Sequence, residues 1–309
     1  MLSLIVEMRQ HALETLVRDD WCVELAARGM NGLVFRATHA DGRDYAVKVT
    51  RRDHRQRAQR EFTALTLMQD SGITARPIAV HPDVPDLPDS SVIVSEWIDA
   101  NPYKPPDSLT GHLRIQQALT VAHQMTTAPL TVMQAALFVQ HPADILADLE
   151  RRYALLPHDY PYLRTLINRA VKFTSPYWAV APRLGLVQCD AWPANVLDNG
   201  TRLYLVDWEN SGWGDPAFEV ADMAAKPGFG SDLGEDDFRQ AAGEHGERLH
   251  DPTLPQRARV YRQLMVVWWA IRLTAYRDAP DQRVAGVVQP NFDYLERMQA
   301  QYVEWALMG

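Results

Sequence analysis

The stretch LVQCDAWPANVL, residues 186–197, places Asp190 and Asn195 five positions apart in a loop bounded by apolar residues. Twelve residues after Asn195, Asp207 ends a second apolar stretch, LVDWE at residues 205–209. Two adjacent loops would therefore deliver two carboxylates and an amide. This set suits phosphoryl transfer, because one carboxylate can orient an attacking hydroxyl while the other oxygen ligands hold Mg²⁺ against the phosphates.

The region around these loops is predicted to be mainly helical. Apolar residues recur at helical spacing in five segments: residues 109–125, 142–156, 162–173, 255–277 and 292–308. Residues 184–188 and 202–206 are predicted to form the one clear strand pair of this region.

The first third of the chain has a different pattern, in which apolar and polar residues alternate. Residues 21–50 are interrupted at Gly29, Gly32 and Asp41-Gly42, which predicts three antiparallel strands joined by tight turns. A helix over residues 55–69 and two more strands near residues 77–80 and 91–97 complete a predicted five-stranded sheet with one helix.

Residues 99–107 contain three prolines and two aspartates, which is typical of a linker. The sequence therefore predicts an α+β protein with an antiparallel N-terminal lobe at 1–98, this linker at 99–107, and a larger helical lobe at 108–309. The latter lobe would carry the catalytic loops, the metal-binding loops and the acceptor site.

The amino-acid composition limits the possible binding partners and indicates the cellular compartment. The net charge of -8 and the absence of a long basic stretch argue against binding to nucleic acid or to an anionic membrane surface. Two cysteines without zinc-ligand spacing favour a reducing cytoplasm over a disulfide framework. The longest apolar run, residues 264–271, is much shorter than the ~20 residues of a spanning helix, so a soluble protein is expected. These residues do not indicate an oligomeric state.

In its ordered motifs the sequence resembles the aminoglycoside phosphotransferase and choline kinase family, which shares the bilobal architecture of protein kinases. The family pattern is a His-Gly-Asp loop with an asparagine five residues after the aspartate, then Asp-Trp-Glu, then Gly-Asp-Pro. Residues 188–195, 207–209 and 214–216 resemble it. The resemblance implies ATP and Mg²⁺ as cofactors, Asp190 as the catalytic base, Asn195 and Asp207 as metal ligands, and Asp215 as a structural brace.

The resemblance also assigns nucleotide-binding residues to the first lobe. A turn containing Gly29, Asn31 and Gly32 would place backbone amides over the ATP phosphates, although two glycines in a hairpin also fit a plain turn. Lys48 is more informative, because a cation in a valine-rich strand must find an anion. It would contact the phosphates and a helix carboxylate, for which Glu61 is the natural candidate; an exposed helix charge is the alternative.

By their order along the chain, Glu96 and Ile98 would lie where kinase-like proteins bind adenine through backbone groups.

Several residues depart from the family pattern. Gln188 and Cys189 replace the histidine and glycine before the catalytic aspartate, and Trp192 stands where protein kinases carry a lysine. Glu219 stands where the family usually has an aspartate, with Asp222 as another candidate for that bracing role. Gln188 and Glu219 are expected to support the loops structurally. These departures keep open the alternative of a catalytically inactive, kinase-like nucleotide-binding or regulatory protein.

The acceptor is expected to be a small molecule, since the seven residues between Asp207 and Asp215 are too few for a peptide-binding activation segment. Trp213 is a candidate acceptor contact in this short segment. Asp232 and Glu235 could line an acidic mouth for a cationic acceptor, with a solvated loop as the alternative. The predicted activity is ATP- and Mg²⁺-dependent phosphorylation of a hydroxyl on an aminoglycoside, a choline-like amine or a related metabolite.

Overall fold

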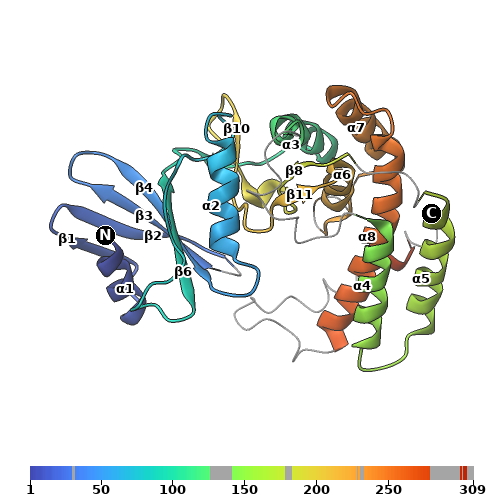
Figure 1. Ribbon diagram of the computed structural model, residues 1–309, viewed down its shortest axis with the longest axis horizontal. Helices are drawn as coiled ribbons and strands as arrows, with labels where there is room; N and C mark the ends of the chain where they lie inside the picture. Colours follow the sequence, from blue (N-terminus) through green and yellow to red (C-terminus); the bar gives the residue numbers. More distant parts are fainter. Residues whose placement is uncertain are drawn as a thin grey trace. The chain divides into compact units, whose positions relative to one another are not determined.

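The structure, a computed structural model, describes residues 1–29, 32–125, 141–177, 183–227, 229, 233–278, 300 and 302–304 (Figure 1). These residues divide into two compact units. The first unit holds residues 1–103 and 194–212, and the second holds residues 104–125, 141–193 and those from 213 onward. The first unit therefore combines the N-terminal third of the chain with a later segment that contains Asn195 and Asp207.

A six-stranded antiparallel sheet forms the centre of the first unit, with strand order β1-β2-β3-β4-β6-β5. The strands are β1 (Thr15–Arg18), β2 (Trp21–Arg28), β3 (Gly32–His39), β4 (Asp44–Arg51), β5 (Pro77–His81) and β6 (Ser90–Glu96). The turn between β3 and β4 uses Gly42 at φ +85°, a backbone conformation that glycine adopts without steric cost. All five predicted strands are present, and β1 is an additional edge strand.

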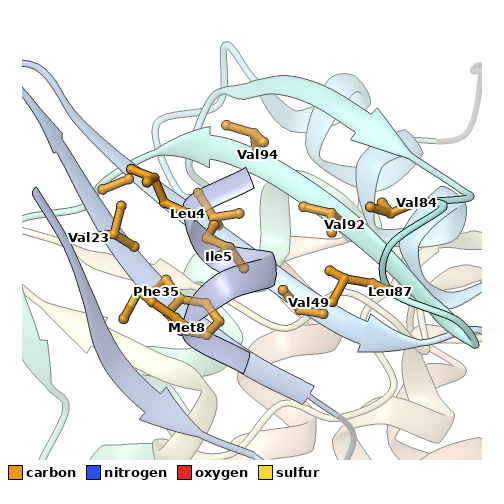
Figure 2. Close-up of a cluster of buried hydrophobic side chains, with 12 residues drawn as sticks. Leu4, Ile5, Met8, Val23, Phe35, Val49, Val84, Leu87, Val92 and Val94 are labelled. Atoms are coloured by element: carbon orange, nitrogen blue, oxygen red, sulfur yellow. The ribbon is translucent and has the colours of Figure 1, made fainter. Parts of the chain in front are cut away.

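Two helices pack on opposite faces of this sheet. Side chains alternate along a strand, so Val47 and Val49 of β4 share one face, and both belong to an apolar cluster with Leu4, Ile5 and Met8 of α1 (Leu2–Gln10) (Figure 2). Helix α2 (Arg57–Met68) approaches the Lys48 side of the same strand. The predicted single helix corresponds to α2, and the prediction missed α1.

Smaller sheets carry the loops of interest. In one, β9 (Val196–Asp198) pairs with β10 (Leu203–Leu205) and with β7 (Asn101–Pro102). In the other, β8 (Gly185–Val187) lies beside β11 (Gly212–Gly214). The predicted pairing of residues 184–188 with 202–206 is therefore wrong, although both segments contain a strand. Strands of three residues offer too little side-chain pattern to specify their partners.

Six α-helices are described in the second unit: α3 (Ser108–His123), α4 (Pro142–Ala154), α5 (Pro161–Thr174), α6 (Pro216–Ala225), α7 (Glu235–Arg248) and α8 (Leu254–Asp278). Four of the five predicted helical segments overlap α3, α4, α5 and α8. The fifth, residues 292–308, lies almost entirely outside the described residues. None of the helices in the described ranges is both long and apolar enough to cross a membrane.

Helix α6 lies at the centre of the second unit, and all ten of its residues are buried. Asp215 caps its first turn by accepting a hydrogen bond from the Ala217 amide at 2.9 Å. Arg257 of α8 donates two hydrogen bonds to the same carboxylate, at 2.8 and 2.9 Å, and a third to Asp251 at 2.9 Å. This buried bidentate pair fixes the start of α6 against α8.

His112 of α3 is fully buried and stacks on Phe229, with 4.3 Å between the ring centroids. Its Nδ1 lies 2.7 Å from the Ser108 carbonyl oxygen, so Nδ1 carries a proton and donates. Burial lowers the pKa of His112 from 6.5 to about 4, because the charged ring would lose its hydration. In the unfolded chain His112 therefore becomes protonated below about pH 6.5, whereas in the folded chain it becomes protonated only near pH 4.

We expect this histidine to make the protein less stable in acid. Its contribution is complete above about pH 6.5, and about 3 kcal/mol is lost as the pH falls to 4. Urea unfolding at several pH values should show a shallower acid loss for His112→Asn, which can keep the donor to Ser108 but cannot titrate. The control is His158→Asn at an exposed site. Equal pH dependence in the wild type and His112→Asn would contradict this assignment.

Candidate functional site

The first unit gathers one lysine and three carboxylates at the end of β10. The Lys48 Nζ donates to Glu61 Oε2 at 2.7 Å and to Asp207 Oδ1 at 2.5 Å, and it lies 3.3 Å from Glu209 Oε2. Strand β4 delivers the lysine, α2 delivers Glu61, and the loop after β10 delivers the other two. The structure thus brings together three of the residues singled out from the sequence, and adds Glu209.

Burial sets the electrostatics of this cluster. The side chain of Lys48 is 16% exposed, and those of Glu61 and Glu209 are 7% and 2% exposed. Burial by itself would lower the pKa of Lys48, but Glu61 and the two other carboxylates outweigh it and raise that pKa. Burial raises the pKa of Glu61 to about 7, with Lys48 opposing the change. The lysine therefore remains charged and holds the carboxylates together.

Asp207 is the most accessible carboxylate of the cluster, with 34% of its side chain exposed. Its backbone has φ +64°, which costs a residue with a side chain roughly 1–2 kcal/mol. Such strain occurs where function requires a particular side-chain direction. Asn195 lies on the adjacent segment, because the Val206 amide donates to the Asn195 carbonyl at 3.0 Å. Both predicted metal ligands therefore flank the same β9–β10 pairing.

Two arginines of α2 hold the loop that carries Asp207. The Arg57 guanidinium donates to Glu209 Oε1, and the Arg60 Nη1 donates to the Ser211 carbonyl at 2.7 Å. The sequence pattern did not assign these roles, because the basic run at residues 51–60 is more typical of an exposed helix face. They fix α2, and with it Glu61, against the loop of Asp207.

The donor set of the first unit suits a hard divalent cation. Carboxylate oxygens of Glu61, Asp207 and Glu209 lie within 4.8 Å of one another. Oxygen ligands are those that Mg²⁺ prefers, and Mg²⁺ typically takes one or two carboxylates together with phosphate oxygens. Asp207 best meets this requirement, because its side chain is 34% exposed whereas those of Glu61 and Glu209 are 7% and 2% exposed. The residues present therefore fit a magnesium ion.

The predicted phosphate-binding turn is only partly described. The Gly29 amide donates to the Gly32 carbonyl at 2.9 Å, which closes the hairpin between β2 and β3. A Cβ on Gly32 would lie 2.3 Å from the Val49 carbonyl oxygen, so the close approach to β4 requires glycine. Asn31 lies outside the described residues. Glu96 is the last residue of β6, and Ile98 follows two positions later.

Asp190 lies in the second unit, in the loop that follows β8, with 28% of its side chain exposed. The preceding residue, Cys189, has φ +63°, at the position where the family pattern has glycine. Burial raises the pKa of the Cys189 thiol well above its usual range, so the thiol stays protonated and is no nucleophile.

Glu219 of α6 binds the backbone of the Asp190 loop. Its carboxylate accepts hydrogen bonds from the Gln188 amide at 3.1 Å and from the Cys189 amide at 2.8 Å. Both Gln188 and Glu219 are buried, and the structure brings these two residues into contact. The amide bonds help to offset the strained backbone at Cys189.

Two histidines that were not predicted from the sequence continue this network. His123 Nε2 lies 2.7 Å from Glu219 Oε2, and His123 Nδ1 lies 2.7 Å from His245 Nε2. A carboxylate can only accept, so His123 donates through Nε2. Burial lowers the pKa of His245 to about 2, which keeps that ring neutral. Lone histidines in two distant helices carry no pattern that would reveal this contact.

A lysine also contacts Asp190. The Lys226 Nζ, at the C-terminal end of α6, donates to Asp190 Oδ1 and lies 3.8 Å from Asp222 Oδ2. No role was predicted for Lys226 from the sequence. Because Asp222 pairs with this lysine while Glu219 accepts the loop amides, Glu219 is the residue that braces the Asp190 loop.

The three candidate acceptor contacts have different surroundings. Trp213 is 3% exposed, which leaves little of its ring available to a ligand. Glu235 is half exposed at the start of α7 but lies 3.0 Å from Arg262, with two further arginines within 4 Å. These cations offset the charge that would attract a cationic acceptor. Asp232 lies outside the described residues.

We compared the sequence and the fold of this chain with those of known proteins. No curated protein matches its sequence significantly. Among solved structures, spectinomycin phosphotransferase APH(9)-Ia in complex with ADP and spectinomycin has a TM-score of 0.65 at 15% identity, with 99% of this chain and 97% of that chain covered. Choline kinase LicA from Streptococcus pneumoniae has a TM-score of 0.63 at 17% identity, with 100% and 99% covered.

A choline/ethanolamine kinase family protein from Mesorhizobium loti has a TM-score of 0.60 at 19% identity, with 93% and 92% covered. These similarities confirm the predicted α+β, kinase-like fold. The model of the phosphotransferase enzyme family matches residues 23–261, which is most of the chain. The predicted relationship is thereby confirmed, and the chain belongs to the phosphotransferase enzyme family, as a kinase of small molecules.

Proposed function

We propose that this protein transfers the γ-phosphoryl group of ATP, with Mg²⁺, to a hydroxyl of a small molecule such as an aminoglycoside, a choline-like amine or a related metabolite. The observation that supports this most is the Lys48 cluster. A buried lysine held between Glu61 and Asp207 is a cation positioned for phosphates beside a carboxylate positioned for a metal ion. Family membership supports the class of reaction.

In this proposal, each described residue has a defined task. Lys48 binds phosphate oxygens of ATP, and Glu61 keeps the lysine in place. Asp207 and Asn195 would hold the magnesium ion, which would supply positive charge against the phosphates. Asp190 accepts the proton of the acceptor hydroxyl. As the new oxygen–phosphorus bond forms, the bond to the bridging oxygen of the leaving ADP breaks.

The small-molecule acceptor follows from the short connection between Asp207 and Asp215. The relatives named above indicate which acceptors to try first, since one was solved with spectinomycin and another is a choline kinase. Because three arginines surround Glu235, we place no cationic acceptor at that residue.

The test is an ATP-consumption screen over aminoglycosides, choline-like amines and hydroxylated metabolites, with mass spectrometry of the product. We expect at least one acceptor to gain a phosphoryl group at the expense of ATP, in a reaction that Asp190→Asn does not support. Binding of ATP with Mg²⁺, without turnover of any acceptor, would instead favour the inactive nucleotide-binding protein.

A further inference from the structure

Lys226 occupies a buried position beside the proposed catalytic base. It follows directly after α6, whose residues are all buried, and its own side chain is only 11% exposed. Its Nζ donates to Asp190 Oδ1, lies 3.8 Å from Asp222, and lies 5.6 Å from the centroid of the Trp192 ring. A rigid helix therefore places this ammonium group against the Asp190 carboxylate.

The ammonium group remains charged in this position. Burial by itself would lower the pKa of Lys226, but the carboxylates of Asp222 and Asp190 outweigh it and raise that pKa. Burial also raises the pKa of Asp222 to about 6, with Lys226 opposing the change. The closer pair is Lys226 with Asp190, because the ammonium group donates to Asp190 Oδ1 and lies 3.8 Å from Asp222 Oδ2.

Trp192 cannot supply a positive charge beside the transferred phosphate, so such a charge would have to come from another part of the chain. It stands two residues after Asp190, where protein kinases carry a lysine near the transferred phosphate, and an indole ring carries no charge. Its ring face can still attract a cation, and the Lys226 ammonium lies near it at a distance suitable for a cation–π contact. Helix α6 thus supplies a positive charge close to the residue that lacks one.

We propose that Lys226 supplies the positive charge beside Asp190 during phosphoryl transfer and is a positioning residue for the Asp190 carboxylate. This inference rests on the proposed function and adds to it. The ammonium group has three donors, of which Asp190 takes one. It holds the carboxylate oriented toward the acceptor hydroxyl. It also offsets negative charge on the equatorial oxygens of the phosphoryl group as that group passes from ADP to the acceptor oxygen.

Lys226→Met removes the charge and keeps most of the side-chain length. We expect kcat to fall about 100-fold, as when one preorganised donor is removed from a reaction centre, while KM for ATP changes less than about threefold. Lys226→Arg restores the charge and should recover at least about tenfold of the loss. The control is Lys172→Met, on an exposed face of α5, with wild-type kinetics expected.

The split between kcat and KM separates this role from simple packing. A lysine that only supports the fold would change the melting temperature without a selective loss of kcat. Loss of a charge at the reaction centre should lower kcat and leave KM for ATP nearly unchanged. Recovery of kcat in Lys226→Arg would identify the charge as the cause.

A second variant tests the inference if Lys226→Met does not fold stably. If Lys226→Met melts early because two carboxylates lose their partner, Lys226→Met combined with Asp222→Asn removes one of those charges, and it carries the same prediction. Lys226→Arg keeps the pairing, and we expect at least a tenth of wild-type kcat. A folded Lys226→Met or double variant with kcat within about threefold of wild type would overturn the inference. A folded Lys226→Arg that loses more than about 100-fold in kcat would also overturn it.

Failure of the inference differs from failure of the proposed function. Slow ATP hydrolysis, with water as the acceptor, is followed beside acceptor phosphorylation. An active wild type with an equally active Lys226→Met would remove only the role of Lys226. A wild type that neither hydrolyses ATP nor phosphorylates any acceptor would overturn the proposed function, and the inference with it.

Discussion

Replacement of Asp190 by asparagine is expected to lower kcat by about 10²–10⁴-fold, the usual contribution of a general base. Asparagine has nearly the same shape and can still accept the hydrogen bond from Lys226, so the loop should keep its conformation. ATP binding, which we assign to the first unit, should remain within about twofold of wild type. Steady-state kinetics and calorimetric titration with ATP measure the two effects separately.

A matched control is Asp236→Asn, at a side chain 94% exposed in the first turn of α7, where wild-type kcat is expected. Asp190→Asn also leaves a positive Lys226 without its carboxylate, so a moderate drop in melting temperature is expected. If the folded variant retained kcat within about threefold of wild type, Asp190 would not be the base.

Replacement of Lys48 by methionine is expected to affect both stability and nucleotide binding. Glu61, Asp207 and Glu209 would lose the cation they share, and removing one partner of a buried ion pair typically costs 3–5 kcal/mol. Arg57 continues to neutralise Glu209, so we place the cost near the lower end, about 3 kcal/mol. Affinity for ATP should fall at least about tenfold, because the phosphates lose a cation.

The double variant Lys48→Met with Glu61→Gln separates the two roles of the lysine. It removes a buried carboxylate together with the ammonium, so we expect it to recover part of the lost unfolding free energy without recovering ATP affinity. Urea unfolding and ATP titration are measured on both variants, with exposed Lys104→Met as the control. Recovery of ATP affinity in the double variant would show that Lys48 serves the fold and not the nucleotide.

Much of the first unit could be predicted because its strands have a clear two-residue alternation. The three strands within residues 21–50 and helix α2 follow the pattern closely. Helix α1 was missed, since nine residues with a short apolar run resemble many other segments. The pairing of β8 was wrong because a strand of three residues finds its partner through tertiary packing, which local sequence does not record.

In the candidate site, too, some residues could be predicted from the sequence and others could not. Lys48 was recognisable because a charge inside a valine-rich strand demands a partner, and Asp207 because it ends a buried strand. Lys226 and Arg57 gave no such signal, since each lies in a polar or helical context where an exposed charge is the usual outcome. Their contacts join residues 36 and 152 positions apart in the chain, and only the folded structure brings them together.

We propose that the oxygen ligands near β10, Asp207 above all, hold a magnesium ion against ATP. ATP affinity, measured by calorimetry with Mg²⁺ and with a chelator in its place, tests this claim in the wild type and in Asp207→Asn. We predict that Mg²⁺ strengthens ATP binding at least about tenfold in the wild type and that Asp207→Asn loses most of this gain. An equal gain from Mg²⁺ in both proteins would contradict the role of Asp207 as a magnesium ligand and the proposed binding of ATP at this cluster.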